Sequence, residues 1–243
     1  MSLGGRLFNM LATPGEVFED IRLRPPSVAN WLVPALIAIV IGWVGSWIVF
    51  SQDSVQHQLS EMSEQAIEKQ IERTKPSQEQ AEAMRAAAAK YGAIGQKISA
   101  MAIPPFTALT TPFIWGLFLW LISKALHAHV DYMKCVEVVG LSSVIGILDG
   151  IVRTLMIVVM GSLWAGPHAG MLLPNFDPQN TVHGILGALS VMTFWILGVR
   201  AVGLARLTGS SFTKAAIWVF GIWAAYTGFF LGLGAVAKAV FSR

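Results

Sequence analysis

The sequence has few charged residues, and long stretches have none. Charged side chains make up 13% of its 243 residues, whereas about a quarter is typical of soluble domains. This shortage, with a mean hydropathy of +0.60, excludes an ordinary soluble protein. The single cysteine, Cys135, excludes an internal disulfide framework. A net charge of +3 in so apolar a chain does not indicate nucleic-acid binding.

The apolar residues gather in five runs that are long enough to cross a bilayer. The runs cover residues 31–50, 101–123, 135–164, 181–199 and 215–236. About 20 apolar residues, rising about 1.5 Å each, cross the hydrocarbon core as a helix. Lipid offers no partner to backbone amides, and the runs lack the alternation of barrel strands. The sequence therefore predicts an all-α integral membrane protein, with a bundle of five transmembrane helices in residues 31–243.

The segment before the first run, residues 1–30, contains a helix start at Thr13-Pro14-Gly15-Glu16. Pro14 suits the first helical position, and Glu16 lies three residues after Thr13, where it can close a capping box. The spacing of apolar residues on both sides predicts two short amphipathic helices. They can lie on the cytoplasmic leaflet as interfacial helices, pack on the spans, or do both.

The segment between the first two runs, residues 51–100, is rich in charge of both signs. Apolar residues at helical spacing precede Pro76, and a weaker capping box begins a second helix at Ser77 and Gln80. We expect a helical hairpin outside the membrane. Its charges are more typical of a solvated face than of a partner site.

Basic residues near the span ends predict the orientation. They occur before the first run, after the second (Lys124 and Lys134) and after the fourth (Arg200, Arg206 and Lys214). Because cytoplasmic loops carry an excess of Lys and Arg, we expect a cytoplasmic N-terminus, an extracytoplasmic 51–100 hairpin and a C-terminus outside.

Two charges stand inside the third run, in the stretch GILDGIVRTLM from 146 to 156. Asp149 and Arg153 are four residues apart, so they share a helix face and can pair. Beside them lies a ladder of small residues that would let another helix approach closely: Ser142, Gly146, Gly150 and Thr154. The pair can be a structural clasp or part of an ion, proton or lipid-headgroup path. We favour the clasp, because a path usually needs more polar partners than the other spans offer.

A short cluster, His127, His129 and Asp131, offers weak candidates for metal ligands. Alternate residues of an extended segment point the same way, and imidazole with carboxylate suits zinc. No second group of ligands accompanies the cluster, and no catalytic motif occurs elsewhere. We therefore expect no metal, no cofactor and no enzymatic activity.

Residues 11–36, LATPGEVFEDIRLRPPSVANWLVPAL, resemble the opening of the Yip1 domain family. There a short P-x-x-x-F/W helix precedes a first span that contains proline. Residues 194–219 resemble the family's junction between spans four and five. The best-known members are eukaryotic Golgi and ER proteins that engage prenylated Rab GTPases. Their Tyr-Gly-Pro motif ahead of the spans is missing here, so the chain looks more like the bacterial branch.

The resemblance implies a non-enzymatic membrane organiser or adaptor that acts through other membrane proteins and contacts membrane lipids. It also implies a multi-pass protein of the bacterial inner (cytoplasmic) membrane. The alternative is a small permease or lipid-moving protein that uses Asp149 and Arg153. Internal repeats would favour transport, and we find none.

Overall fold

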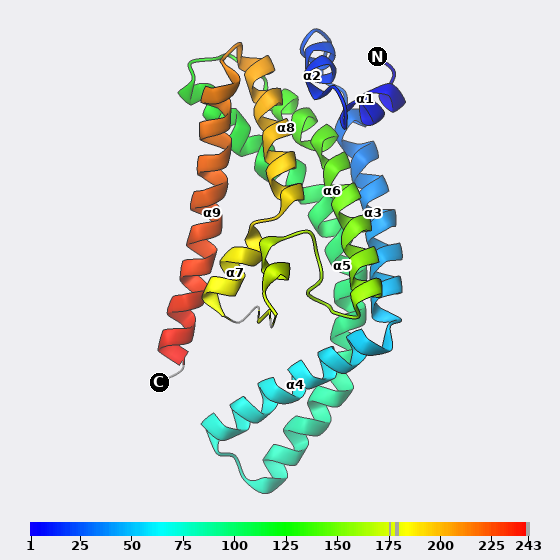
Figure 1. Cartoon of the computed structure of the whole chain (residues 1–243), viewed down its shortest axis with the longest axis vertical. Coiled ribbons are helices and arrows are strands. Elements are labelled where there is room, and N and C mark those ends of the chain that lie inside the picture. The colour runs from blue at the N-terminus through cyan, green and yellow to red at the C-terminus, as the bar shows by residue number, and fades with distance from the viewer. Residues whose placement is uncertain (175, 178–179, 242–243) are drawn as a thin grey trace.

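The computed structural model describes residues 1–174, 176–177 and 180–241 (Figure 1). In these residues the fold is all helical and contains no β-strand. The elements are α1 (Leu3–Asn9), α2 (Pro14–Arg22), α3 (Ala29–Phe50), α4 (Asp53–Thr74), α5 (Gln78–Ala125), α6 (Tyr132–Met160), the 3-10 helix η1 (Ala169–Leu172), α7 (Thr181–Ala188), α8 (Val191–Thr208) and α9 (Phe212–Phe241).

Among the described residues, five helices are long and apolar enough to span a membrane: α3, the apolar part of α5, α6, α8 and α9. They run along the long axis of the molecule and leave the N- and C-termini at opposite ends (Figure 1). Large apolar side chains on their outer surfaces are exposed, as a lipid-facing surface requires; examples are Trp47, Phe106, Val159 and Phe229. The prediction of an all-α integral membrane protein with five transmembrane helices is confirmed.

The predicted fourth span, residues 181–199, is wrong in its boundaries. The chain leaves helical geometry at Leu189 and Ser190, between α7 and α8. There the amide of Ala169 donates to the Leu189 carbonyl at 3.0 Å, and the amide of Val191 donates to the Pro167 carbonyl at 3.1 Å. These bonds to a distant loop satisfy backbone groups at the break. Arg200 and Arg206 consequently lie inside α8 and not in the loop that follows it.

The hairpin segment and the second span share one helix, α5, which has 48 residues and continues through Pro104, Pro105 and Pro112. Its N-terminus forms the complete capping box of Ser77 and Gln80. The capping box expected at α2 is wrong. Although α2 begins at Pro14, the side chain of Thr13 makes no capping hydrogen bond, and its backbone (φ −132°, ψ 58°) is not extended.

Helices α3 and α6 make the most extensive helix pair in the bundle. At Gly140 of α6, a Cβ atom would overlap the backbone and Cβ of Trp31 in α3. Only glycine permits this approach. Above it, the buried Phe18 and Ile21 of α2 join the core of the spans together with Leu141, so α2 packs on the bundle.

The two ends of the bundle differ. We call the end with α1 and α2 the N-terminal face, and the end with α4 the hairpin face (Figure 1). At the hairpin face, α4 leans across the end of the spans and returns through the first half of α5.

Candidate functional site

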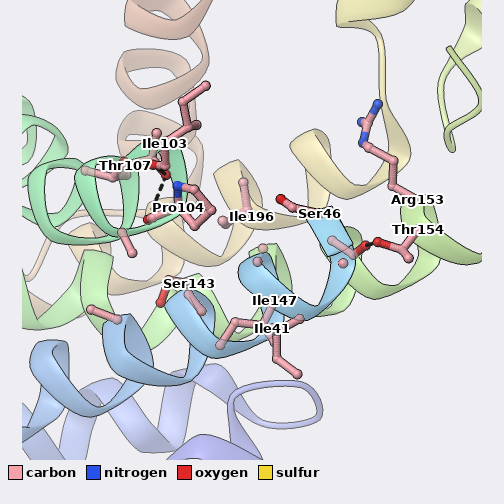
Figure 2. A pocket seen from close by; sticks show the side chains of 18 of the residues that line it. Ile41, Ser46, Ile103, Pro104, Thr107, Ser143, Ile147, Arg153, Thr154 and Ile196 are labelled. Carbon is pink, nitrogen blue, oxygen red and sulfur yellow. Dashed lines mark hydrogen bonds between the residues drawn. The ribbon is translucent and has the colours of Figure 1, made fainter. Parts of the chain in front are cut away.

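A cavity of about 730 Å³ lies between α3, α5, α6 and α8. Figure 2 shows its wall, which includes Ile41 of α3, Ile103 and Pro104 of α5, Ile147 of α6 and Ile196 of α8. Small-molecule sites typically have volumes of about 300–1,000 Å³ and mostly apolar walls with a few polar groups. The cavity has these properties, and it lies within the spans.

Asp149 and Arg153 form a loose pair at this cavity. The closest atoms, Arg153 Nη2 and Asp149 Oδ2, are 3.8 Å apart, and the two side chains are 41% and 27% exposed. Arg153 lines the cavity, and its side chain projects from α6 at the cavity edge (Figure 2). Its guanidinium lies against Gly166 of the loop after α6. The pair is therefore more open than a buried clasp.

The four small residues of α6 have different surroundings. Gly146 and Gly150 line the cavity, and a Cβ at Gly150 would meet no atom within 4 Å. The close helix approach expected beside these glycines occurs instead at Gly140. At Thr154, the hydroxyl lies 2.8 Å from where a Cβ of Gly45 would stand, so α3 does approach α6 there. Ser142 is buried and contacts α8.

Arg200 is the cavity residue that sequence reasoning misplaced. It lies in the middle of α8, is 4% exposed and lines the cavity. Its Nε donates to Ser142 Oγ at 3.3 Å, and its guanidinium carbon lies 4.6 Å from the ring centroid of Trp115. In the described part of the chain, no carboxylate lies within ion-pair distance of Arg200.

A second set of buried charges lies at the N-terminal face. Glu137 of α6 is fully buried and accepts hydrogen bonds from the Asn30 side chain at 2.6 Å and the Ser27 amide at 2.7 Å. Lys134 Nζ lies 2.9 Å from Glu137 Oε2 and donates to the Ile21 carbonyl at 2.6 Å. Glu137 thereby joins α6 to the start of α3, and Lys134 joins α6 to the end of α2.

The same set continues into α1. Arg6 donates to Asp20 Oδ2 from Nε at 2.9 Å and from Nη2 at 2.7 Å, and to Asn30 Oδ1 at 2.9 Å. The Met1 amine, and then Arg6 and Arg24, hold the pKa of the Asp20 carboxyl well below its usual range. We call Arg6, Asp20, Asn30, Lys134 and Glu137 the N-terminal charge network. It fastens both N-terminal helices to the spans.

Comparison with known families identifies the fold that carries these two sites. The family model for the Yip1 domain matches residues 8–234. The chain belongs to the Yip1 family. The match includes α2, the membrane-spanning parts of the five helices, the cavity and the charge network apart from Arg6, and it confirms the resemblance in residues 11–36 and 194–219. Searches of the curated proteins and of the solved structures gave no match. Placement in a bacterial branch of the Yip1 family is not borne out by the match.

The structure does not bring His127, His129 and Asp131 together as a group of three ligands. No group of three potential ligands comes together within the part that the structure describes. Asp131 instead caps α6, where its carboxylate accepts from the Met133 amide at 2.6 Å. His127 has a left-handed backbone (φ 57°) in the preceding turn and is exposed.

Sequence signals for the missed residues of this Yip1 protein were present but ambiguous. Glu137 stands inside the predicted third span, so it was detectable as a second acid in an apolar run. Lys134 and Arg200 stand at the edges of predicted spans and were assigned to loops. Their partners lie far away in the sequence, and only the fold brings them together.

Proposed function

We propose that this Yip1 protein is a non-enzymatic membrane organiser or adaptor that acts through protein partners. The observation that carries the proposal is the direct attachment of the hairpin of α4 and α5 to the membrane domain, through the continuous helix α5 and through contacts at the base of α4. An adaptor needs an exposed surface that is connected to its membrane anchor, and this hairpin offers one.

The base of the hairpin is anchored by apolar packing and by hydrogen bonds. Val55 of α4 is fully buried against Val49, Ile157 and Ala165. The Gln58 amide nitrogen donates to the Gly161 carbonyl at 2.7 Å, and its oxygen accepts from the Leu163 amide at 3.0 Å. Both bonds join α4 to the loop after α6.

The outer part of the hairpin is continuous with the membrane domain along its other arm. Helix α5 continues from the hairpin into its membrane span without interruption. Arg85 pairs with Glu68 of α4 in a two-bond contact of 2.8 and 3.1 Å. Most side chains of the hairpin are exposed, among them Tyr91. The result is a solvated arm, continuous with a membrane span, that can present a surface to another protein.

A non-enzymatic role is supported by the chemistry of the cavity. Its described lining has hydroxyl and arginine side chains but no His, Asp, Glu, Lys or Cys. Arginine remains protonated and is a poor general base. The hydroxyls therefore have no base beside them that would activate them as nucleophiles.

The experiment is photo-crosslinking in native membranes. A photoreactive amino acid at Tyr91 should give a discrete protein adduct, whereas one at Phe229 on α9, which is equally exposed at 62%, should label lipid. Gln58→Ala, which loosens the base, should weaken the Tyr91 adduct, and the exposed Gln65→Ala should not. A Tyr91 position that labels only lipid, or an adduct that Gln58→Ala leaves unchanged, would contradict the proposal.

We further propose that the N-terminal face is cytoplasmic and that the protein resides in a bacterial inner membrane. The gathering of basic residues at that face supports this orientation, because cytoplasmic segments carry an excess of Lys and Arg: Arg6, Arg22, Arg24, Lys124, Arg206 and Lys214. A tag in the hairpin should be accessible from outside intact cells, and one near Thr208 should be protected. Reversed labelling would contradict the orientation.

The second candidate is a small permease or lipid-moving protein that uses Asp149 and Arg153. The cavity favours it, because Arg153 lines a polar-edged space within the spans. Replacing both charges, as in Asp149→Leu with Arg153→Met, distinguishes the candidates. A double variant that folds stably but loses the growth or flux phenotype supports a transport path. A stable double variant that keeps this phenotype excludes that path.

A further inference from the structure

Arg200 retains hydrogen-bonding capacity that the protein does not use. A guanidinium has five N–H donors, and to the residues that the structure describes Arg200 donates one hydrogen bond, to Ser142 Oγ. Stacking on Trp115 covers one face of the group without using those donors. Because the side chain is 96% removed from solvent (4% exposed), water at the protein surface does not compensate for the missing partners. A buried cation without a counter-charge is costly.

The position of Arg200 places this unmatched charge just below the N-terminal charge network. Ser142 follows Glu137 by five residues on α6, which corresponds to about 7.5 Å along the helix. The guanidinium therefore lies one to two helical turns inside the charged layer at the N-terminal face. An anionic group that enters from a bilayer surface needs to move only a short distance to reach it.

The rest of the cavity determines what kind of anion fits. Its described lining contains two arginines, Arg200 and Arg153, and no acidic residue. Ser143 and Thr154 both line the cavity and are 11 residues apart on α6, about 16 Å along the helix. The wall between them is mainly apolar, with Ile41, Ile103 and Ile147. This arrangement suits a molecule with one negative head and a long apolar tail.

We propose that the cavity binds one anionic phospholipid. The phosphate accepts hydrogen bonds from the free N–H donors of Arg200, and an acyl chain lies along the apolar wall of α3 and α5 toward Arg153. We choose an anionic lipid as the occupant because of charge complementarity: arginine pairs strongly with phosphate oxygens. The site requires neither transport nor the partner-binding role of the hairpin, so it stands apart from the proposed function.

The test measures the lipid that stays with the purified full-length protein. The protein is placed in nanodiscs of phosphatidylcholine alone or with phosphatidylglycerol, and bound lipid is quantified by native mass spectrometry. We expect selective retention of phosphatidylglycerol and a rise in Tm with it. Arg200→Met should lower that retention roughly tenfold or more, because a charge-assisted contact is lost. Arg200→Lys should retain part of it.

Arg153→Met tests the other arginine of the cavity, which has Asp149 as a partner. Its loss of phosphatidylglycerol should be clearly smaller than that of Arg200→Met. Gly150→Leu tests the apolar wall independently: a Cβ there meets no atom within 4 Å, so the variant should fold with its side chain in the cavity and lose the lipid. It also keeps the proposal testable if Arg200→Met does not fold.

Four outcomes would overturn the proposal. Equal retention of phosphatidylcholine would show that the site does not select lipids by charge. Unchanged retention of phosphatidylglycerol in Arg200→Met would show that Arg200 does not bind the phosphate. A loss in Arg153→Met as large as in Arg200→Met would move the phosphate to the other end of the cavity. Stabilisation by about 10 mM inorganic phosphate in the absence of phosphatidylglycerol would show that the site binds a free anion and not a lipid.

Discussion

The N-terminal charge network and the cavity both bury charged side chains among the helices, but they balance them differently. Glu137 has no exposed surface and is surrounded by Asn30, the Ser27 amide and Lys134. Arg200 is almost as deeply buried and has one weak hydrogen bond and an aromatic ring. The comparison teaches that burial alone does not define a structural charge. A buried charge that is paired with an opposite charge, as Glu137 is with Lys134, indicates a structural role, and a buried charge without a counter-charge leaves room for a ligand.

The largest effect should follow from breaking the network. Glu137→Ala removes the acceptor of two hydrogen bonds and leaves Lys134 buried without its carboxylate, which costs about 3–5 kcal/mol for a broken buried pair. Thermal unfolding in detergent or nanodiscs measures the loss. Glu137→Gln, which keeps an acceptor oxygen, should lose less. A Glu137→Ala variant as stable as the wild type would show that the network does not hold the helices.

A smaller effect should separate two glycines of α6, one beside the network and one at the cavity. Gly140→Ala forces a Cβ into Trp31 and should destabilise the protein by about 1–3 kcal/mol, as overpacking usually does. Gly150→Ala enters open space and should be neutral or stabilising, since alanine favours helix by up to about 1 kcal/mol over glycine. Equal unfolding temperatures for the two variants would contradict this assignment of tight and open regions.

The network should also make the thermal stability of the protein depend on pH. The pKa of Asp20 is lowered in the folded state, so its contribution is fully present above the unfolded value of about 3.9 and is lost as pH falls through the folded value. The Tm of the wild type should therefore fall more between pH 5 and pH 3 than the Tm of Asp20→Asn. Parallel Tm profiles for the two proteins would rule out this source of acid sensitivity.

A weaker interaction is expected for Asp149 and Arg153. Their atoms are 3.8 Å apart and both side chains are partly exposed, so a double-mutant cycle on thermal stability should give a coupling below about 1 kcal/mol. The single variants Asp149→Ala and Arg153→Ala should add nearly independently. A coupling of several kcal/mol would restore the interpretation of the pair as a clasp.

The smallest effect on stability should come from Arg200, in contrast to Glu137. In neutral detergent without anionic lipid, Arg200→Met replaces an unmatched buried cation by an apolar chain of similar length, which is often neutral or stabilising for buried charges. We expect a change in unfolding free energy within about 1 kcal/mol of zero. A loss as large as that of Glu137→Ala would mean that Arg200 is a structural residue like those of the network.

The sequence by itself determined the features that depend on local composition. Five spans followed from long uncharged runs, because lipid accepts few charges and requires internally bonded backbone. The start of α2 at Pro14 and the capping box at Ser77 followed from residue types that act within one helical turn. Cavity-lining Arg153 was singled out because a charge inside an apolar run is visible without any structure.

Only the tertiary structure decided which distant groups meet. The break between α7 and α8 depends on backbone bonds to Pro167 and Ala169, which no local pattern near Ser190 reveals. The pairing of Glu137 with Asn30 crosses 107 positions of the chain. Gly140 and Gly150 are both glycines of α6, yet Gly140 touches α3 and Gly150 lines the cavity. The physical reason is that burial and partner choice depend on how whole helices pack, whereas the tendency to span a membrane is set by each segment alone.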